Sequence, residues 1–136
     1  MGRDIRIVVI EDDEIIREGY TLLIGQTEGY KVVNSYASFD EAAKTIADDS
    51  PDVILLDIEL PGTNGIQAIP KLKRMMPHAY ILILTVYESE KMIFDALANG
   101  ASGYLTKNTP AAKIVESHRA DHAATQKSAK QMARSR

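Results

Sequence analysis

Short apolar runs alternate along the chain with longer segments in which apolar residues recur every three or four positions. The length and β-branched content of the runs predict five strands, at residues 5–10, 31–37, 52–56, 80–85 and 102–106. The segments between the runs predict four helices, at residues 14–24, 38–48, 65–76 and 90–99. Thr109 and Pro110 are typical of a helix start and predict a fifth helix.

Two local features refine the predicted helices. Ser38 and Glu41 form the S-x-x-E pattern of a capping box, so we expect the second helix to begin directly after Ser38. Pro70 lies inside the third helical segment, where its ring and its missing N–H disfavour a regular helix. We therefore expect either a kink at Pro70 or a helix that starts nearer to it.

Three of the predicted strands, residues 5–10, 52–56 and 80–85, are apolar at nearly every position rather than at every second one. Strands that are buried on both faces have this composition, and parallel sheets covered by helices bury their strands in this way. Alternating strands and helices joined by right-handed crossovers give a doubly wound α/β domain. Ligands of such domains bind beyond the carboxyl ends of the strands. The residues that follow the strands are therefore the candidates for function.

Composition narrows the class of protein. A chain of 136 residues has the length of one domain, and it contains no cysteine, which excludes disulfides and thiolate metal sites. Charged residues occur throughout the first fifteen positions, and no apolar run is long enough to span a bilayer. We therefore expect no signal peptide, no membrane segment and a cytoplasmic location.

Charge is distributed unevenly between the body of the chain and its end. Residues 117–136 hold five Lys or Arg and a single Asp, whereas the remainder of the chain is net acidic. An acidic body argues against nucleic-acid binding by simple electrostatics. From Glu116 onward the apolar residues are Ala and Met132, which offer little area to bury. We expect a polar basic tail at residues 119–136, and we expect the chain past about residue 120 to be frayed in an isolated monomer.

Carboxylates and other reactive side chains follow four of the predicted strands. These residues are Glu11, Asp12, Asp13, Asp57, Glu59, Thr85 and Lys107. The carboxyl ends of parallel strands meet at one edge of the sheet, so several carboxylates would lie close together and repel one another unless a cation joined them. Mg²⁺ is the usual hard cation for oxygen ligands, and such a pocket could receive a phosphoryl group. A carboxylate can also accept a phosphoryl group covalently.

Four segments carry a resemblance to a known family, namely "VVIEDDEIIREG", "DVILLDIELPGTNGIQA", "ILILT" and "GASGYLTKNTP". In this order and spacing they resemble the receiver domain of bacterial response regulators over about residues 4–116. The second and fourth segments look most like receivers of NarL/LuxR-type transcriptional regulators. The resemblance implies a flavodoxin-like fold, with a five-stranded parallel sheet in strand order 2-1-3-4-5 and helices on both faces. We expect the receiver domain to cover residues 1–118.

The resemblance also implies roles for the acidic residues. Asp57 would accept a phosphoryl group from the phosphohistidine of a sensor kinase. Asp12 would ligate Mg²⁺ directly and Glu11 through water, while Asp57 and the backbone carbonyl of Glu59 would complete the protein ligands. Glu11 stands where the family more often has Asp, which makes it the least typical member of this set.

Further residues are implicated in binding the phosphoryl group and in its lifetime. By the resemblance, Thr85 and Lys107 would bind the phosphoryl oxygens, and Tyr104 would be the switch aromatic that moves inward with Thr85. Glu59 and Tyr87 each follow a site residue by two positions, and are expected to flank the path of the hydrolytic water and to tune dephosphorylation.

The implied function is signalling rather than turnover of a substrate. We expect a histidine kinase as partner, homodimerisation on phosphorylation, and no enzymatic activity beyond self-phosphorylation from phosphodonors and autodephosphorylation. Nothing after residue 116 resembles a helix-turn-helix domain, so DNA binding would require a domain absent from this chain.

Three alternatives remain open at this point. A stand-alone receiver could act by protein–protein contact. A Mg²⁺-dependent phosphohydrolase of the haloacid dehalogenase type would also use an aspartyl nucleophile, but it usually carries a second Asp two residues later, where this chain has Glu59. A nucleotide-binding domain would need a Gly-rich loop after the first strand, which is missing here.

Overall fold

The computed structural model describes residues 4–58, 65–85 and 90–106. Its centre is a parallel sheet of five strands, which are β1 (Ile5–Ile10), β2 (Tyr30–Tyr36), β3 (Val53–Asp57), β4 (Tyr80–Thr85) and β5 (Gly103–Thr106). Their order is β2-β1-β3-β4-β5, as the resemblance implied. The strand bounds agree with the predicted ones to within a residue or so, and the one difference that matters for function is that β3 includes Asp57.

Four helices connect the strands. They are α1 (Glu14–Gly25), α2 (Phe39–Asp49), α3 (Gly65–Met75) and α4 (Glu90–Ala98). Ser38 is the N-cap of α2 and accepts a hydrogen bond from the Glu41 N–H at 3.2 Å, which confirms the predicted start of this helix. Helix α3 begins at Gly65 and contains Pro70, so the alternative in which it starts nearer to Pro70 is wrong. The expected fifth helix and the tail, residues 119–136, lie outside the described residues.

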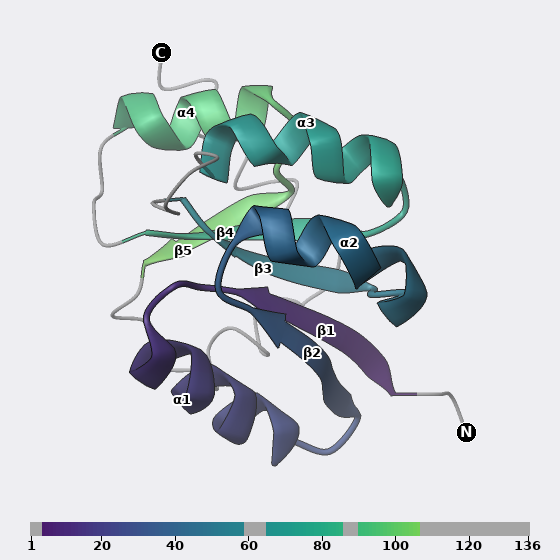
Figure 1. Ribbon diagram of the computed structural model, residues 1–136. Helices are drawn as coiled ribbons and strands as arrows, with labels where there is room; N and C mark the ends of the chain where they lie inside the picture. The colour runs from purple at the N-terminus through teal and green to yellow at the C-terminus, as the bar shows by residue number, and fades with distance from the viewer. Residues whose placement is uncertain (1–3, 59–64, 86–89, 107–136) are drawn as a thin grey trace.

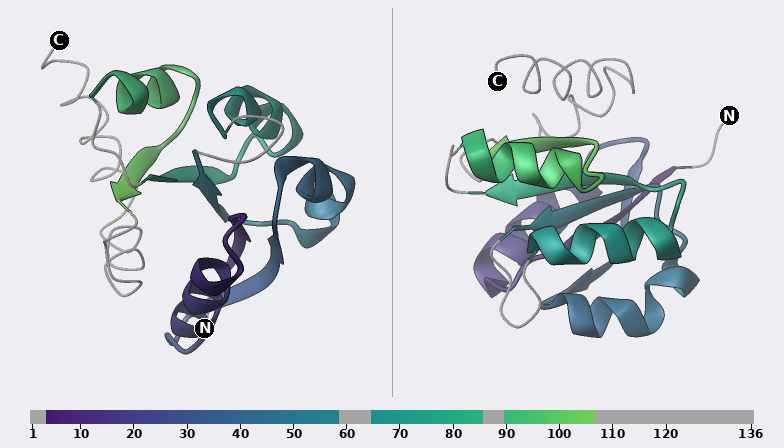
Figure 2. Two further views of the ribbon diagram at one scale, coloured as in Figure 1. Left: turned by 60° about the vertical axis from the view of Figure 1, so that its left-hand side comes forward. Right: turned by 90° about the horizontal axis from the view of Figure 1, so that it is seen from above.

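The helices cover both faces of the sheet. Figures 1 and 2 show α1 on one side of the sheet and α2, α3 and α4 on the other. Successive strand residues point to opposite faces, so Val9 and Leu55 pack with Tyr20 and Ile24 of α1, whereas the next residue of each strand joins the opposite core. The apolar runs are therefore buried on both sides, which is why they do not alternate with polar residues.

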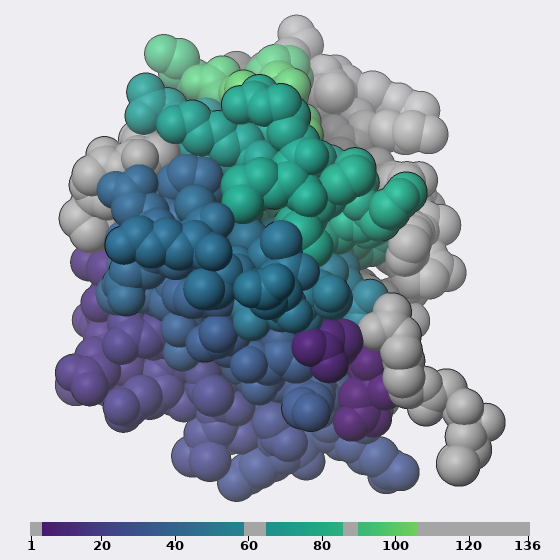
Figure 3. All heavy atoms as spheres, turned by 45° about the vertical axis from the view of Figure 1, so that its right-hand side comes forward, coloured from purple at the N-terminus to yellow at the C-terminus, as the bar shows by residue number. Residues whose placement is uncertain are grey.

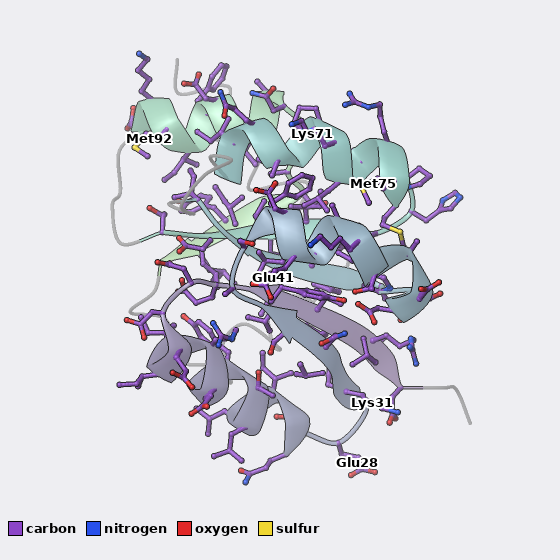
Figure 4. All side chains as sticks on the ribbon, viewed as in Figure 1. Glu28, Lys31, Glu41, Lys71, Met75 and Met92 are labelled. Carbon is purple, nitrogen blue, oxygen red and sulfur yellow. The ribbon has the colours of Figure 1, made fainter. Side chains whose placement is uncertain are left out.

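The face that carries α2 and α3 has a continuous outer surface, formed where side chains of these two helices meet (Figure 3). Figure 4 shows Glu41 of α2 and Lys71 of α3 on this face, whereas Glu28 and Lys31 lie near the start of β2, away from these two helices. All four residues are exposed. Lys71 of α3 lies with its ammonium 5.7 Å from the centre of the Phe39 ring, so a cation–π contact joins α3 to the first turn of α2. Among the described helices, none is long and apolar enough to cross a membrane.

A polar network ties together the amino ends of β1 and β3 and the end of α2. We call it the Arg6 network, and it consists of Arg6, Asp49, Ser50 and Asp52. The Arg6 guanidinium donates to the carbonyls of Asp49 (2.7 and 3.0 Å) and Ser50 (3.3 Å), which end α2. The backbone N–H of Arg6 donates to the Asp52 carboxylate at 2.9 Å. A cation at a helix C-terminus also interacts favourably with the helix dipole, so this network anchors α2 to the sheet.

Tyr36 adds a second attachment of α2 to the sheet. Its hydroxyl donates to the Asp49 carboxylate, and it lies 2.7 Å from the Thr45 hydroxyl. Burial, and after it the hydrogen bond to Asp49, raises the pKa of the Tyr36 hydroxyl above its usual range. The hydroxyl therefore keeps its proton and remains a donor to Asp49 at neutral pH.

Candidate functional site

The three consecutive acids after β1 occupy three different environments. Glu11 is fully buried and Asp12 is exposed, yet both contribute carboxylate oxygens to one cluster with Asp57. Asp13 instead caps α1, because its carboxylate accepts hydrogen bonds from the N–H groups of Ile15 (2.9 Å) and Ile16 (3.1 Å). Only two of the three loop acids therefore belong to the site.

The acidic cluster, which consists of Glu11, Asp12 and Asp57, has its ligand atoms within 4.8 Å of one another. Asp57 is the last residue of β3 and is fully buried, and its Cα pairs with that of Leu84 in β4. The Glu11 N–H donates to the Tyr36 carbonyl at 3.0 Å, which continues the pairing of β1 with β2 by one residue. The ends of four neighbouring strands thus fix the two buried members of the cluster.

This arrangement concentrates negative charge where water cannot fully solvate it. Two of the three carboxylates are buried, and like charges at this separation oppose ionisation unless a cation joins them. All the ligand atoms are carboxylate oxygens, which suits a hard divalent ion such as Mg²⁺ and does not suit a soft metal. The residues present therefore fit the predicted Mg²⁺ site.

Two other predicted site residues are described. Thr85 ends β4 and is 1% exposed, directly after the residue that pairs with Asp57, so it belongs to the same edge of the sheet as the cluster. Tyr104 of β5 is half-buried and packs against the core that contains α2, α3 and α4. This placement is compatible with a packing role and with a switching one. Glu59, Tyr87 and Lys107 lie outside the described residues, so their roles stay predictions.

Gly65, the first residue of α3, packs against the main chain at the end of β3, and the sequence did not predict this role. Its N–H donates to the Ile58 carbonyl at 3.1 Å. A Cβ at this position would lie 2.4 Å from the Asp57 carbonyl oxygen and 2.5 Å from the Ile58 Cα. Both atoms belong to the backbone, which cannot turn aside as a flexible side chain could. Only glycine allows α3 to approach the main chain of Asp57 this closely.

Arg17 is a second residue for which the sequence predicted no role at the site. It lies on α1, and its Nη1 donates to the backbone carbonyl of Glu11 at 2.8 Å. The sequence does place a basic residue one helical turn beyond the acidic loop, but the hydrogen bond depends on the direction in which α1 leaves that loop. Arg17 thus touches the main chain between the two loop members of the cluster.

Comparison with known proteins places these features in a family. The response regulator receiver domain family matches residues 7–119. The oxygen regulatory protein NreC of Staphylococcus haemolyticus is 36% identical over 106 residues, covering 77% of this chain and 49% of that protein. The response regulator GacA of Pseudomonas viridiflava is 34% identical over 115 residues, covering 85% of this chain and 54% of that protein. The chain therefore spans about half the length of these curated relatives.

Solved structures show the same architecture. A LuxR-family two-component response regulator from Aurantimonas sp. SI85-9A1 superposes with a TM-score of 0.82 at 33% identity, covering 97% of each chain. The signal receiver domain of NarL from Mycobacterium tuberculosis superposes with a TM-score of 0.79 at 27% identity, covering 85% of this chain and 93% of that one. Both similarities extend over nearly the whole of the matched structures.

Proposed function

This chain belongs to the response regulator receiver domain family, of the NarL/LuxR type, and from that premise we propose that it accepts a phosphoryl group on Asp57 from a sensor histidine kinase. The observation that carries the proposal is the acidic cluster, in which a fully buried Asp57 ends a central strand within 4.8 Å of two further carboxylates. Membership of this family does not favour the alternative hypotheses of a phosphohydrolase or a nucleotide-binding domain.

The proposed reaction is an in-line transfer to one carboxylate oxygen of Asp57. That oxygen attacks the phosphorus of the phosphohistidine, the P–N bond breaks, and its electron pair stays on the imidazole nitrogen. The product is an acyl phosphate. Thr85 and Lys107 would bind the phosphoryl oxygens through a hydroxyl and an ammonium, and Tyr104 would follow Thr85 inward. Glu59 and Tyr87 would set the rate at which water removes the phosphoryl group.

Mg²⁺ would be held by Glu11, Asp12 and Asp57, together with the backbone carbonyl of Glu59. When bound, it would neutralise the negative charge that accumulates as a phosphoryl group approaches three carboxylates. The residues of the chain contribute a fixed geometry, since strand pairing sets the backbone positions of Glu11 and Asp57 before any ligand arrives.

The output of the phosphorylated domain is a second part of the proposal. The chain spans about half of its curated relatives, so transcriptional control would act through a segment that the matched region does not include. Phosphorylation would change a surface that promotes homodimerisation or contact with an effector in the cytoplasm. Catalytic activity would be limited to self-phosphorylation from small phosphodonors and to autodephosphorylation.

The test is the intact mass of the protein after incubation with Mg²⁺ and acetyl phosphate. Wild type should gain one phosphoryl group that is labile to base, and Asp57→Asn should gain none, because an amide cannot attack phosphorus. Asp48→Asn, which changes an exposed acid on α2, is the matched control and should behave as wild type. Phosphorylation of Asp57→Asn at the wild-type rate would show that the acceptor has been assigned to the wrong residue.

A further inference from the structure

We infer that Arg17 is a positioning residue for the cation site, and that it acts by holding the peptide group between Glu11 and Asp12 through its hydrogen bond to the Glu11 carbonyl. The inference rests on the proposed function, because it assigns a residue to the Mg²⁺ site of the phosphoryl acceptor. Arg17 belongs to no predicted ligand set, and its guanidinium contacts the main chain of the loop.

The main chain of Glu11 is held by a hydrogen bond on each side. Its N–H donates to the Tyr36 carbonyl at 3.0 Å, and its carbonyl accepts from Arg17 Nη1 at 2.8 Å. The peptide groups on both sides of Glu11 are thus held, one by the sheet and one by α1. The second of these peptide groups also begins Asp12. The Arg17 contact therefore helps to set the direction in which both side chains leave the backbone, together with the hydrogen bond that the Asp13 N–H donates to the Glu11 carboxylate at 3.4 Å.

The other end of the acidic loop is also held, at Asp13. The Asp13 carboxylate caps α1 through the N–H groups of Ile15 and Ile16, so Asp13 is fixed to the helix. Asp12 stands between two held residues, although its own side chain is exposed. An exposed side chain loses conformational entropy when it binds an ion, and a backbone that is already ordered reduces this loss. Release of the Glu11 carbonyl would remove one of the restraints.

Arg17 lies near the N-terminus of α1. Its backbone N–H makes the first turn of the helix by donating to the Asp13 carbonyl at 2.8 Å. A basic side chain is disfavoured at this end of a helix, where the dipole is positive. The side chain is nevertheless folded back toward the loop, where it donates to a partly buried carbonyl. This contact, rather than helix stability, is the physical reason for an arginine here.

A charge effect and a positioning effect predict opposite results. If Arg17 acted chiefly by its positive charge, its removal would leave the acidic cluster more negative and would strengthen Mg²⁺ binding. If Arg17 acts by holding the loop, its removal lets the carboxylates lose their geometry and weakens binding. We expect weakening of about three- to tenfold, which is the size of one hydrogen bond to a charged donor after partial compensation by water.

The experiment is calorimetric titration of Mg²⁺ into the full chain with no phosphodonor present. The variants are Arg17→Met, which keeps much of the apolar stem, and Arg17→Lys, which keeps the charge and a donor. Arg74→Met removes an exposed arginine of α3 and is the matched control. We expect weaker binding in Arg17→Met, an intermediate affinity in Arg17→Lys, and no change in Arg74→Met.

A second readout separates positioning from general damage to the fold. With acetyl phosphate, Arg17→Met should need more Mg²⁺ for half-maximal phosphorylation, while its rate at saturating Mg²⁺ stays within about twofold of wild type. Should Arg17→Met fail to fold, Arg17→Leu, a good helix former that also lacks a donor, carries the test, and wild-type affinity in that variant would overturn the positioning role. Equal or tighter Mg²⁺ binding by a folded Arg17→Met would also overturn it. If wild type itself bound no Mg²⁺, the proposed function would fail instead.

Discussion

The two ends of β1 use charged side chains in opposite ways. Near its start, Arg6 joins the Arg6 network, in which its guanidinium donates to two helix-terminal carbonyls and its backbone N–H donates to the Asp52 carboxylate. Directly after its end, Glu11 enters a cluster made only of carboxylates. Charged side chains that bond to the main chain in this way hold a helix to the sheet. Like charges that converge remain available to bind a cation. The start of β1 thus stabilises the fold, and the end of β1 forms the candidate site.

Gly65→Ala is expected to have the largest effect, because Gly65 packs against the backbone of Asp57 and the substitution should lower both stability and phosphorylation. The added Cβ would meet the backbone of Asp57 and Ile58, so we expect the free energy of unfolding in urea to fall by about 2–3 kcal/mol. Phosphorylation should slow as well, since the main chain of the acceptor is displaced.

Gly19→Ala is the matched control for that variant. Gly19 lies within α1 and nothing lies within 4 Å of the position that its Cβ would take. Alanine is a better helix former than glycine, so this variant should be more stable than wild type by about 0.5–1 kcal/mol. Wild-type stability of Gly65→Ala would mean that α3 can retreat from Asp57 at no cost.

Arg6→Met sharpens the comparison at the structural end. The substitution leaves the carbonyls of Asp49 and Ser50 without the guanidinium, and the free energy of unfolding should fall by about 2 kcal/mol. Mg²⁺ affinity, measured by calorimetry on the folded protein, should stay at the wild-type value. A large loss of Mg²⁺ binding in this variant would show that the two ends of β1 are coupled and not separate.

Asp12→Asn gives the converse result at the chemical end, with the smallest energy of the three. Mg²⁺ affinity should fall about tenfold, which corresponds to about 1.4 kcal/mol, because a direct anionic ligand becomes neutral. Stability without Mg²⁺ should be unchanged or higher, since one of three like charges is removed. Glu11→Gln should weaken binding less, as expected for a ligand that acts through water. The reverse order of the two variants would make Glu11 the direct ligand.

Much of the fold could be predicted because its signals are local or follow from simple topology. The apolar runs of β1, β3 and β4 are buried on both faces, and the Ser38 cap is a pattern of four residues. The convergence of Glu11, Asp12 and Asp57 followed from the rule that parallel strands end at one edge. These inferences require no knowledge of distances between segments.

Two of the features that the sequence did not reveal depend on how closely two segments approach in space. The role of Gly65 rests on a helix start that presses against the end of β3, and that of Arg17 on the direction of α1. Asp13 was grouped with its two acidic neighbours, although an Asp directly before an apolar helical pattern is also an N-cap signal. Pro70 illustrates the reverse case for the start of a helix, since α3 begins at Gly65 and includes Pro70.

The strand order has a consequence for how the chain is made. The sheet is ordered β2-β1-β3-β4-β5, so in chain order β2 can pair with β1, and β3, β4 and β5 can then each join an edge that is already open. No strand has to be inserted between two that have already paired. A ribosome releases the strands in this same sequence, at about 5–20 residues per second. Each newly released strand can therefore extend the sheet as it emerges, and β1 borders the first two strands that would be added.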